Sequence, residues 1–267
     1  PPPPPPLFFL HPQAPKRDAQ ESRGLGDVYK RQGIGNAIAQ ELLNAGAKVA
    51  LHFNSNSDGV SKLKEQFSDQ CELFQADFNN VHETIKLFED VLSWGDTLDV
   101  LINNAGTAIM SSVNLDDEIW INNWNTIMNI NLLSAGVLSK KALEHFKTKH
   151  GGRIINIASR AAFRGDTPDY LAYAASKAGM VALIRSIARG FGKDGITAFS
   201  IAPGFTRTAM AQKSIDKYGE DFVMKDVALN ELTEPKDIAP IVTLICSGKL
   251  DHGTGSNIDI NAGSYVR

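Results

Sequence analysis

The chain has 267 residues, of which 43% are hydrophobic and 21% are charged, and its net charge is −3. This length suits one large α/β domain or two small ones, and the composition is ordinary for a soluble globular protein. The small negative charge gives no electrostatic reason to expect a nucleic acid or an anionic membrane as partner, and no apolar run approaches the ~18 residues of a membrane span.

Residues 1–32 do not match the rest of the chain. Pro1–Pro6 form a polyproline run, which favours an extended segment without internal hydrogen bonds. The apolar patch Leu7–Leu10 is too short for a secretion signal, and the stretch up to Gln32 has neither strand nor helix periodicity. We therefore expect a disordered or non-native leader, such as a junction or read-through sequence fused at Gln32. Recovery of the native transcript would test this expectation.

Strands and helices alternate from residue 33 on. Apolar runs predict strands at 48–53, 72–76, 98–102, 153–158, 196–201 and 256–260. Helical stripes predict helices after Gly33 and at 60–67, 82–94, 171–191 and 235–246, with two helices in 119–150 and a mobile, partly helical segment at 207–232. Continuous apolar strands are typical of a sheet with helices on both faces. Residues 33–267 are therefore predicted to form one α/β domain with a Rossmann-type, doubly wound parallel sheet.

One strand is missing from this pattern. A doubly wound sheet needs an apolar strand directly before its first glycine turn, and Leu25–Gln32 occupies that place. This segment is too polar for a strand that is buried on both faces. We expect the first strand to be missing or replaced, and the chain to fold poorly or to bind its ligand weakly as a result.

Tyr173 and Lys177 lie four residues apart in a predicted helix and therefore share one face. A free phenol titrates near pH ~10 and is a poor acid or base at neutral pH. A neighbouring ammonium stabilises the phenolate and lowers this pKa, so the pair is a candidate proton-transfer centre. The same spacing also occurs by chance on half-exposed helices.

Small, polar and turn-forming residues follow the predicted strands at their carboxyl ends. Ligands bind at this edge of a doubly wound sheet, so these residues predict a pocket there. They are Gly33, Ile34, Gly35, Phe53, Asn54, Asp77, Asn103, Asn104, Ala105, Gly106, Ser159, Pro203 and Gly204.

In this order of motifs the chain resembles the short-chain dehydrogenase/reductase family, over roughly residues 33–267. The motifs are Asn103-Asn104-Ala105-Gly106, Asn131, Ser159, Tyr173 with Lys177, and Pro203-Gly204-Phe205-Thr206-Arg207-Thr208. Within the family, the chain looks most like the 3-oxoacyl-acyl-carrier-protein reductase branch. The resemblance implies a cytoplasmic oxidoreductase that transfers a hydride between a nicotinamide cofactor and a carbonyl or secondary alcohol, with a 3-oxoacyl thioester as one candidate substrate. It also implies a homodimer or homotetramer, paired through the two long helices.

The resemblance gives each catalytic candidate a role. Tyr173 would protonate the carbonyl oxygen, and Ser159 would hydrogen-bond the same oxygen. Lys177 would hold the ribose hydroxyls and lower the pKa of Tyr173. Asn131 would hold a water that links Lys177 to solvent. Plainer interpretations stay open: Ser159 could cap a turn, and Asn131 could be an ordinary helix residue.

The implied cofactor contacts lie along the same strand ends, and no metal is expected. They are Gly33, Ile34, Gly35, Asn54, Asp77, Phe78, Asn104, Ala105, Gly106, Tyr173, Lys177, Pro203, Gly204, Thr206 and Thr208. A carboxylate at the end of the second strand would hold the ribose of NAD and repel a 2′-phosphate. Phe53 and Asn54 stand there instead, so NADP(H) is favoured over NAD(H). Asp77 could also be only a turn former.

The chain departs from the family's glycine motif, Thr-Gly-xxx-Gly-x-Gly, because Val28 and Tyr29 stand where threonine and glycine are expected. The basic residue that many NADP-using members carry falls on Gln32. Two alternatives to an enzyme therefore remain: a non-catalytic dinucleotide-binding protein on the same fold, and a truncated inactive product. Melting with and without NADPH would separate the truncated product from the others.

Overall fold

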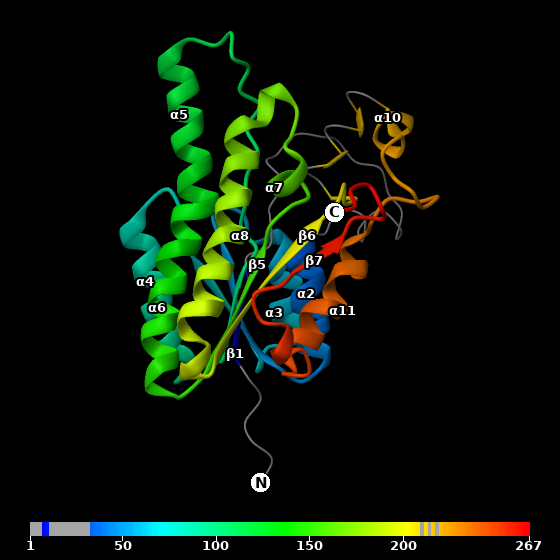
Figure 1. Cartoon of the computed structure of the whole chain (residues 1–267). Coiled ribbons are helices and arrows are strands. Elements are labelled where there is room, and N and C mark those ends of the chain that lie inside the picture. The colour runs from blue at the N-terminus through cyan, green and yellow to red at the C-terminus, as the bar shows by residue number, and fades with distance from the viewer. Residues whose placement is uncertain (1–6, 11–32, 209–210, 213–214, 217–218) are drawn as a thin grey trace.

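The computed structural model describes residues 7–10 by their backbone, and residues 33–208, 211–212, 215–216 and 219–267. Its centre is a seven-stranded parallel sheet with the strand order β3-β2-β1-β4-β5-β6-β7 (Figure 1). The strands are β1 Leu7–Leu10, β2 Lys48–Phe53, β3 Cys71–Gln75, β4 Val100–Asn103, β5 Gly152–Ile157, β6 Ile196–Pro203 and β7 Asn257–Ile260.

The helices follow the predicted stripes closely. They are α2 Ile34–Asn44, α3 Asp58–Gln66, α4 Val81–Gly95, α5 Asp117–Met128, α6 Ser134–Thr148, α7 Ala161–Arg164, α8 Leu171–Phe191, α10 Glu220–Met224 and α11 Pro235–Cys246, with short 3-10 turns η2 Pro168–Tyr170, η3 Gly192–Asp194 and η4 Asp251–Gly253. The two helices predicted in 119–150 run on without a break, because a π-helical turn, η1 Asn129–Leu133, joins α5 to α6. Within 207–232, α10 confirms a partly helical segment.

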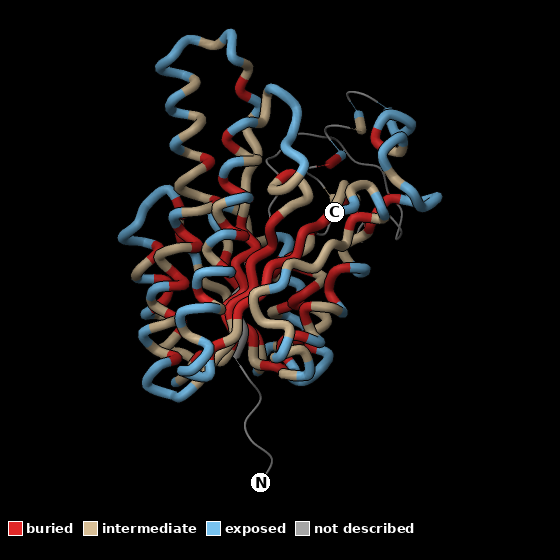
Figure 2. The backbone as a smooth tube through the Cα atoms, viewed as in Figure 1, coloured by how far each residue is buried: buried red, intermediate tan, exposed pale blue. Residues whose placement is uncertain are grey.

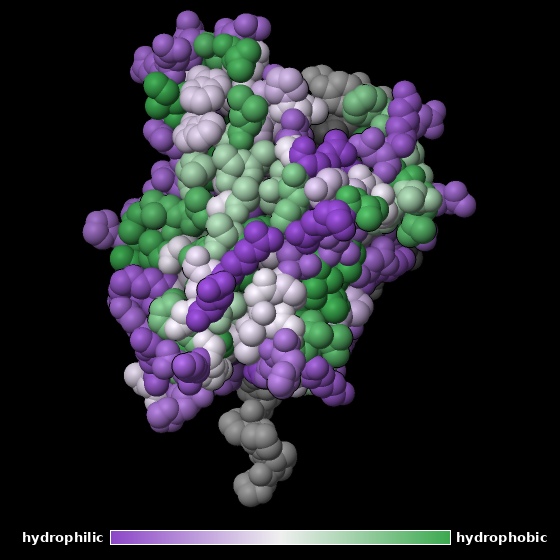
Figure 3. All heavy atoms as spheres, in the orientation of Figure 1, coloured by the Kyte–Doolittle hydropathy of each residue, from purple (hydrophilic) through white to green (hydrophobic). Residues whose placement is uncertain are grey.

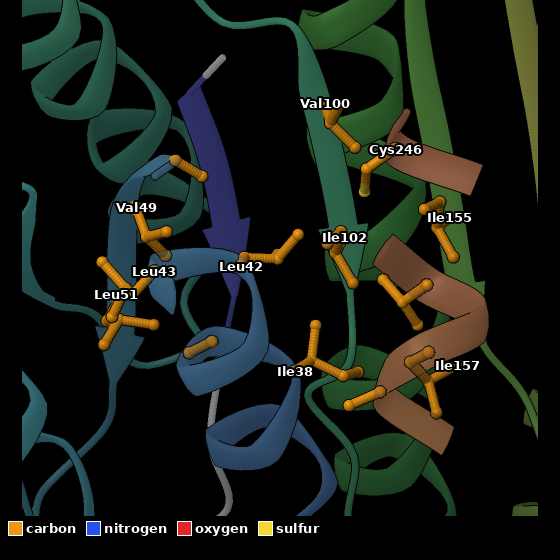
Figure 4. Close-up of a cluster of buried hydrophobic side chains, with 14 of the residues drawn as sticks. Ile38, Leu42, Leu43, Val49, Leu51, Val100, Ile102, Ile155, Ile157 and Cys246 are labelled. Carbon is orange, nitrogen blue, oxygen red and sulfur yellow. The ribbon is translucent and has the colours of Figure 1, made fainter. Parts of the chain in front are cut away.

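Each face of the sheet has its own hydrophobic core. On one face, α2 and α11 pack against each other and bury Ile38 and Leu42 with strand residues such as Ile102 and Ile155 (Figure 4). On the other face, α4, α6 and α8 enclose a core that includes Phe146. Figure 2 shows the strands buried between helices whose outer sides are exposed. Burial on both faces explains why the strands are continuous apolar runs.

Leu7–Leu10 forms the first strand of the sheet, which agrees with the prediction that this strand is either missing or replaced by another segment. β1 pairs with β2 along Leu7–Leu10, and with β4 at Phe8 and Phe9. An apolar run of this kind suits a strand that lies between two others, so a segment that was assigned to the leader serves as the first strand. Residues 1–6 and 11–32 lie outside the described residues, and the foreign origin of the leader stays a prediction.

The strand order places a topological switch point between β1 and β4, where crossovers leave in opposite directions. A crevice opens at the carboxyl edge of such a sheet. Asn103, Ile157 and Pro203 end three neighbouring strands at this edge. The fold therefore brings the predicted site residues to one side of the molecule.

Helix α8 with its flanking turns, Pro168–Asp194, is long and apolar enough to cross a membrane by length and composition. Its residues Met180, Ile184 and Ile187 are buried, and the helix contacts β5 and β6. The apolar character of α8 is therefore explained by packing on the sheet.

Candidate functional site

The side chains of Ser159 and Tyr173 meet at the carboxyl edge of the sheet. Ser159 follows β5 directly after Ala158, and Tyr173 stands in the first turn of α8. The Ser159 hydroxyl lies close enough to the Tyr173 phenol to lower its pKa through hydrogen bonding. Ser159 Oγ also accepts a hydrogen bond from the backbone N of Ala161 at 3.1 Å. The serine therefore caps the turn into α7 and at the same time faces the phenol.

The pKa of the Tyr173 phenol lies above its ordinary value. Burial raises it, the hydrogen bond from Ser159 lowers it, and the negative charge of Asp166 raises it. Lys177 Nζ lies 5.8 Å from the centre of the Tyr173 ring, and no hydrogen bond joins the two groups. The net shift is upward because loss of hydration dominates, and the lowering of this pKa by Lys177 stays a prediction.

Lys177 is a buried cation, with 4% of its surface exposed. Its Nζ donates to the backbone oxygen of Ile157 at 2.9 Å and lies 3.6 Å from Sδ of Met180. Burial lowers its pKa from 10.5 to about 8. An ammonium carries several N–H donors, and only one of them meets an oxygen among the described residues. A second N–H donates to Sδ of Met180, which leaves one donor available to a ligand.

Asn131 connects three elements through its side chain. It lies in η1 and is fully buried. Its Oδ1 accepts from the backbone N of Thr107 at 2.7 Å, while Nδ2 donates to Thr107 O at 3.0 Å and to Ser176 Oγ at 2.9 Å. Ser176 Oγ in turn donates to the backbone oxygen of Tyr173 at 2.8 Å. Both N–H groups of Asn131 are used in this way, so the predicted water would have to bind its backbone.

A row of polar side chains crosses four strands beneath α8. Asn103, Asn156, Ser200 and Asn257 are paired in register from β4 to β7. Asn103 Nδ2 donates to Asn156 Oδ1 at 2.8 Å, and Asn156 Nδ2 donates to the backbone oxygen of Met180 at 3.0 Å. Ser200 Oγ donates to Asn257 Oδ1 at 2.8 Å. The row links the sheet to the helix that carries Tyr173 and Lys177, and sequence analysis missed it.

The N-terminus of α2 fits the pyrophosphate of a dinucleotide. Gly33 is its N-cap, no side chain caps the helix, and the first turn holds no acidic residue. Free N–H groups at a helix N-terminus bind anions. Gly33 and Gly35 are buried while Ile34 is half-buried, so little side-chain bulk stands before these N–H groups.

The second and third strands bring their predicted cofactor residues to the same edge. Asn54 is exposed directly after β2. Phe78 is buried, and its ring stacks on His52 with 4.1 Å between centroids. Asp77 accepts a hydrogen bond from the backbone N of Asn79 at 2.9 Å. Asp77 therefore stabilises the turn after β3, as the alternative interpretation of this residue predicted.

The loops after β4 and β6 hold the other predicted contacts. Asn104 and Ala105 are buried, and half-buried Gly106 follows them. Gly204 follows Pro203, and a Cβ at Gly204 would lie 2.7 Å from Cα of Asn261, so no larger residue fits there. Thr206 Oγ1 donates to Gly204 O at 3.1 Å, and Thr208 Oγ1 accepts from the backbone N of Ala211 at 3.4 Å.

Arg160, which directly follows Ser159, was missed by sequence analysis. Its side chain is 14% exposed, and Nη1 lies 3.8 Å from Oδ2 of Asp226. Nη1 is buried without a hydrogen-bond partner. Arg164, one turn further on, donates to the same Asp226 oxygen at 2.8 Å. The sequence does hold a signal for Arg160, because it places a charged residue directly after the predicted Ser159.

Comparison with known proteins gives a consistent result. A family model described as "Enoyl-(Acyl carrier protein) reductase" matches residues 28–264. The chain is 30% identical over 238 residues to the 3-oxoacyl-acyl-carrier-protein reductase of Vibrio harveyi, covering 88% of this chain and 94% of that protein. It is 32% identical over 236 residues to the reductase of the same description from Haemophilus influenzae, covering 88% and 95%.

Two further matches extend this comparison. Nodulation protein G of a Rhizobium species is 32% identical over 232 residues, covering 86% of this chain and 92% of that protein. Among solved structures, the crystal structure of gox2181 matches with a TM-score of 0.83 and 21% identity, covering 97% of this chain and 95% of that chain. At this level of identity the structural match shows the fold.

Proposed function

The chain belongs to the short-chain dehydrogenase/reductase family, in its 3-oxoacyl-acyl-carrier-protein reductase-like branch, and on this premise we propose that it reduces a carbonyl to a secondary alcohol with NADPH. Membership makes it an NAD(P)-dependent oxidoreductase with a nicotinamide dinucleotide as cofactor. The names of the relatives suggest a 3-oxoacyl thioester as one candidate substrate. The observation that carries the proposal is the placement of Ser159 next to the Tyr173 phenol, with the buried ammonium of Lys177 near the same ring.

When bound, the nicotinamide supplies the hydride that reaches the carbonyl carbon. Tyr173 then donates its proton to the carbonyl oxygen as negative charge develops there, and Ser159 donates a second hydrogen bond to the same oxygen. Burial raises the pKa of Tyr173, so the phenol is protonated at neutral pH, as an acid must be. Lys177 stabilises the phenolate that remains and offers its remaining N–H donor to the ribose hydroxyls.

The choice of NADP(H) over NAD(H) is supported by the end of β2. Phe53 ends the strand and Asn54 follows it, so no carboxylate stands where it would repel a 2′-phosphate. We expect kcat/KM for NADPH to exceed that for NADH with the same carbonyl substrate. A preference for NADH would contradict this part of the proposal alone.

Replacing Tyr173 by phenylalanine tests the mechanism. Tyr173→Phe keeps the ring and its packing but removes the transferable proton, so turnover should fall by about 100- to 10,000-fold. NADPH binding, measured by fluorescence titration, should persist. Tyr170→Phe is the matched control, because Tyr170 lies in η2 three residues earlier and has alanine four residues later. Retained turnover in Tyr173→Phe would remove Tyr173 from the mechanism, and bound NADPH without turnover of any carbonyl would favour a non-catalytic binding protein.

We also propose a cytoplasmic homodimer or homotetramer that pairs through the two long helices, the continuous α5–η1–α6 and α8. Ile119 and Ile121 of α5, Leu133 of η1 and Leu171 of α8 expose apolar side chains, and apolar residues gather on the surface of these helices (Figure 3). Light scattering measures the assembly. Ile121→Asp should shift it toward the monomer, whereas an unchanged mass would exclude this face as the interface.

A further inference from the structure

We propose that the carbonyl substrate carries an anionic group, a carboxylate or a phosphate, and that Arg160 binds this group beside Ser159 and Tyr173. The inference rests on the proposed function, because it names the substrate class of the same site. It makes Arg160 a specificity-determining residue.

The position of Arg160 is fixed by its backbone. It is the N-cap of α7 and directly follows Ser159. Its backbone N donates to the backbone oxygen of Pro203 at 3.0 Å. Arg160 therefore stands between the hydroxyl pair and the end of β6. The side chain of Arg160 therefore leaves the backbone next to Ser159 and Tyr173.

The guanidinium of Arg160 has no hydrogen bond to any residue that the structure describes. Its side chain is 14% exposed, and Nη1 is buried without a partner. A guanidinium has several N–H donors in a planar fork, and a buried donor left unpaired is costly. Buried polar groups are nearly always paired, so an exception needs an explanation. A substrate anion that occupies the site during turnover is such an explanation.

The acidic groups near Arg160 are already engaged. Asp226 accepts a hydrogen bond from Arg164 at 2.8 Å, and its Oδ2 is 3.8 Å from Arg160, too far for a hydrogen bond. Asp166 accepts from the backbone N of Thr167 at 2.8 Å. The charges of Asp166 and Asp226 balance those of Arg160 and Arg164. The N–H donors of Arg160 nevertheless have no acceptor among the described residues. Carboxylate and phosphate match this fork with two parallel hydrogen bonds.

The position of Arg160 points to the substrate rather than to a phosphate of the cofactor. The N-terminus of α2, which fits the pyrophosphate, follows β1, whereas Arg160 follows β5, beyond β4 in the sheet. The neighbour of Arg160 in the chain is Ser159, which is proposed to meet the substrate oxygen. A neutral acyl chain would leave the guanidinium unpaired, so a charged substrate is favoured.

Matched pairs of substrates test the inference in the intact protein with NADPH. Acetoacetate and methyl acetoacetate share one 3-oxo group and differ by the charge of a carboxylate. Dihydroxyacetone phosphate and dihydroxyacetone share one ketone and differ by the charge of a phosphate. We expect kcat/KM for the anionic member of one pair to exceed that of its neutral partner by roughly 10- to 100-fold. The pair that shows the preference tells whether the anion is a carboxylate or a phosphate. Equal values in both pairs would overturn the inference and leave the proposed function intact.

Variants assign the preference to Arg160. Arg160→Met removes the donors and keeps an unbranched apolar stem, and it should reduce the ratio of anionic to neutral kcat/KM to near one, mainly through KM. Arg160→Lys should restore part of the ratio. Arg185→Met removes the same charge from an exposed position of α8 and should leave the ratio unchanged. A ratio that survives in Arg160→Met would overturn the inference.

A binding measurement keeps the test independent of turnover. Malonate is a carboxylate without a ketone, and it should raise the melting temperature of the wild-type protein but not that of Arg160→Met. If no carbonyl is reduced at all, the proposed function fails, and the malonate shift alone decides whether Arg160 is an anion site. Equal shifts in the two proteins would count against it.

Discussion

Lys177 is a buried charge for which the described part of the chain provides no carboxylate partner. Its pKa is 10.5 as a free group and about 8 in the fold, because burial penalises the charged form. Between these pH values the unfolded chain holds a proton that the folded chain has lost, so stability rises with pH across this window. Below about pH 8 both states are charged, and the folded state carries the full cost of burying the ammonium.

Lys177→Met should therefore stabilise the ligand-free protein at neutral pH. The shift of the Lys177 pKa corresponds to a cost of about 3 kcal/mol for burying the ammonium, which the variant no longer carries. The backbone oxygen of Ile157 loses its donor in the variant, and this loss reduces the gain in the free energy of unfolding by ~1–2 kcal/mol. The gain should fade as the pH rises toward 10.5, where wild-type Lys177 is neutral in the fold. Urea denaturation across this range measures it, with the exposed Lys62→Met as control. A variant that is less stable than wild type at neutral pH would contradict the argument.

The pH dependence of carbonyl reduction should follow the same two groups. Tyr173 must hold its proton, and burial raises its pKa, so this group stays in the right form through neutral pH. Lys177 must be charged, and its pKa is about 8. We expect kcat/KM to be constant at neutral pH and to fall above about pH 8. Steady-state rates over this range test the expectation, and a rate that is still constant at the ordinary pKa of lysine would contradict it.

The grouping of the candidate residues at one edge of the sheet could be predicted from sequence, but the direction of their pKa shifts could not. Tyr173 and Lys177 have a fixed spacing on a helix, and Ser159 ends an apolar strand, so pattern alone indicated all three. The direction of the Tyr173 pKa depends on burial and on a distance to Lys177 that spacing does not give. Arg160 was not predicted, because only the structure shows that its guanidinium is buried without hydrogen-bond partners among the described residues.

At the scale of elements, the polar row beneath α8 is expected to hold the site together. Asn156 joins Asn103 of β4 to the backbone oxygen of Met180 in α8, and it is fully buried. Asn156→Ala breaks both hydrogen bonds and leaves their partners unpaired, so the free energy of unfolding should fall by roughly 2–4 kcal/mol. Asn257→Ala, at the half-buried end of the same row, should cost less.

A double-mutant cycle separates the network from simple loss of volume. If Asn103 and Asn156 act as a pair, Asn103→Ala should cost much less when Asn156 is already alanine, with a coupling of roughly 0.5–3 kcal/mol. Denaturation of the four proteins measures this coupling. Fully additive effects would show that the two side chains contribute independently.

Element boundaries were predictable where apolar periodicity is strong, as in α8 and β6. The π-helical turn at Asn129–Leu133 was not, because five residues are too few to change the helical periodicity of the flanking helices. This turn contains Asn131, whose amide reaches both Thr107 and Ser176. The π turn is thus a local deviation at a candidate functional residue, as such turns often are.

At the scale of the whole molecule, the parallel doubly wound sheet followed from the alternation of strands and helices, but the segment that forms its first strand did not. Leu7–Leu10 was assigned to the leader, and 22 residues, 11–32, separate it from the glycine turn at Gly33. Pairing in a parallel sheet is non-local, so the partners of a short apolar run cannot be read from its neighbours in sequence. The sheet has seven strands only because this segment lies between β2 and β4.

Substitutions at Phe9 test whether the protein depends on β1. Phe9 pairs with Ala50 on one side and with Leu101 on the other. Proline has no N–H group and cannot donate to the ladder, so it is poorly tolerated in a central strand. Phe9→Pro should therefore lower the free energy of unfolding by at least ~1–3 kcal/mol more than Phe9→Val, which keeps the N–H group and a residue suited to strands. Urea denaturation and NADPH titration of both variants measure the difference. Equal stability and equal NADPH affinity would show that Leu7–Leu10 is not the strand between β2 and β4, and that the site at this edge forms without it.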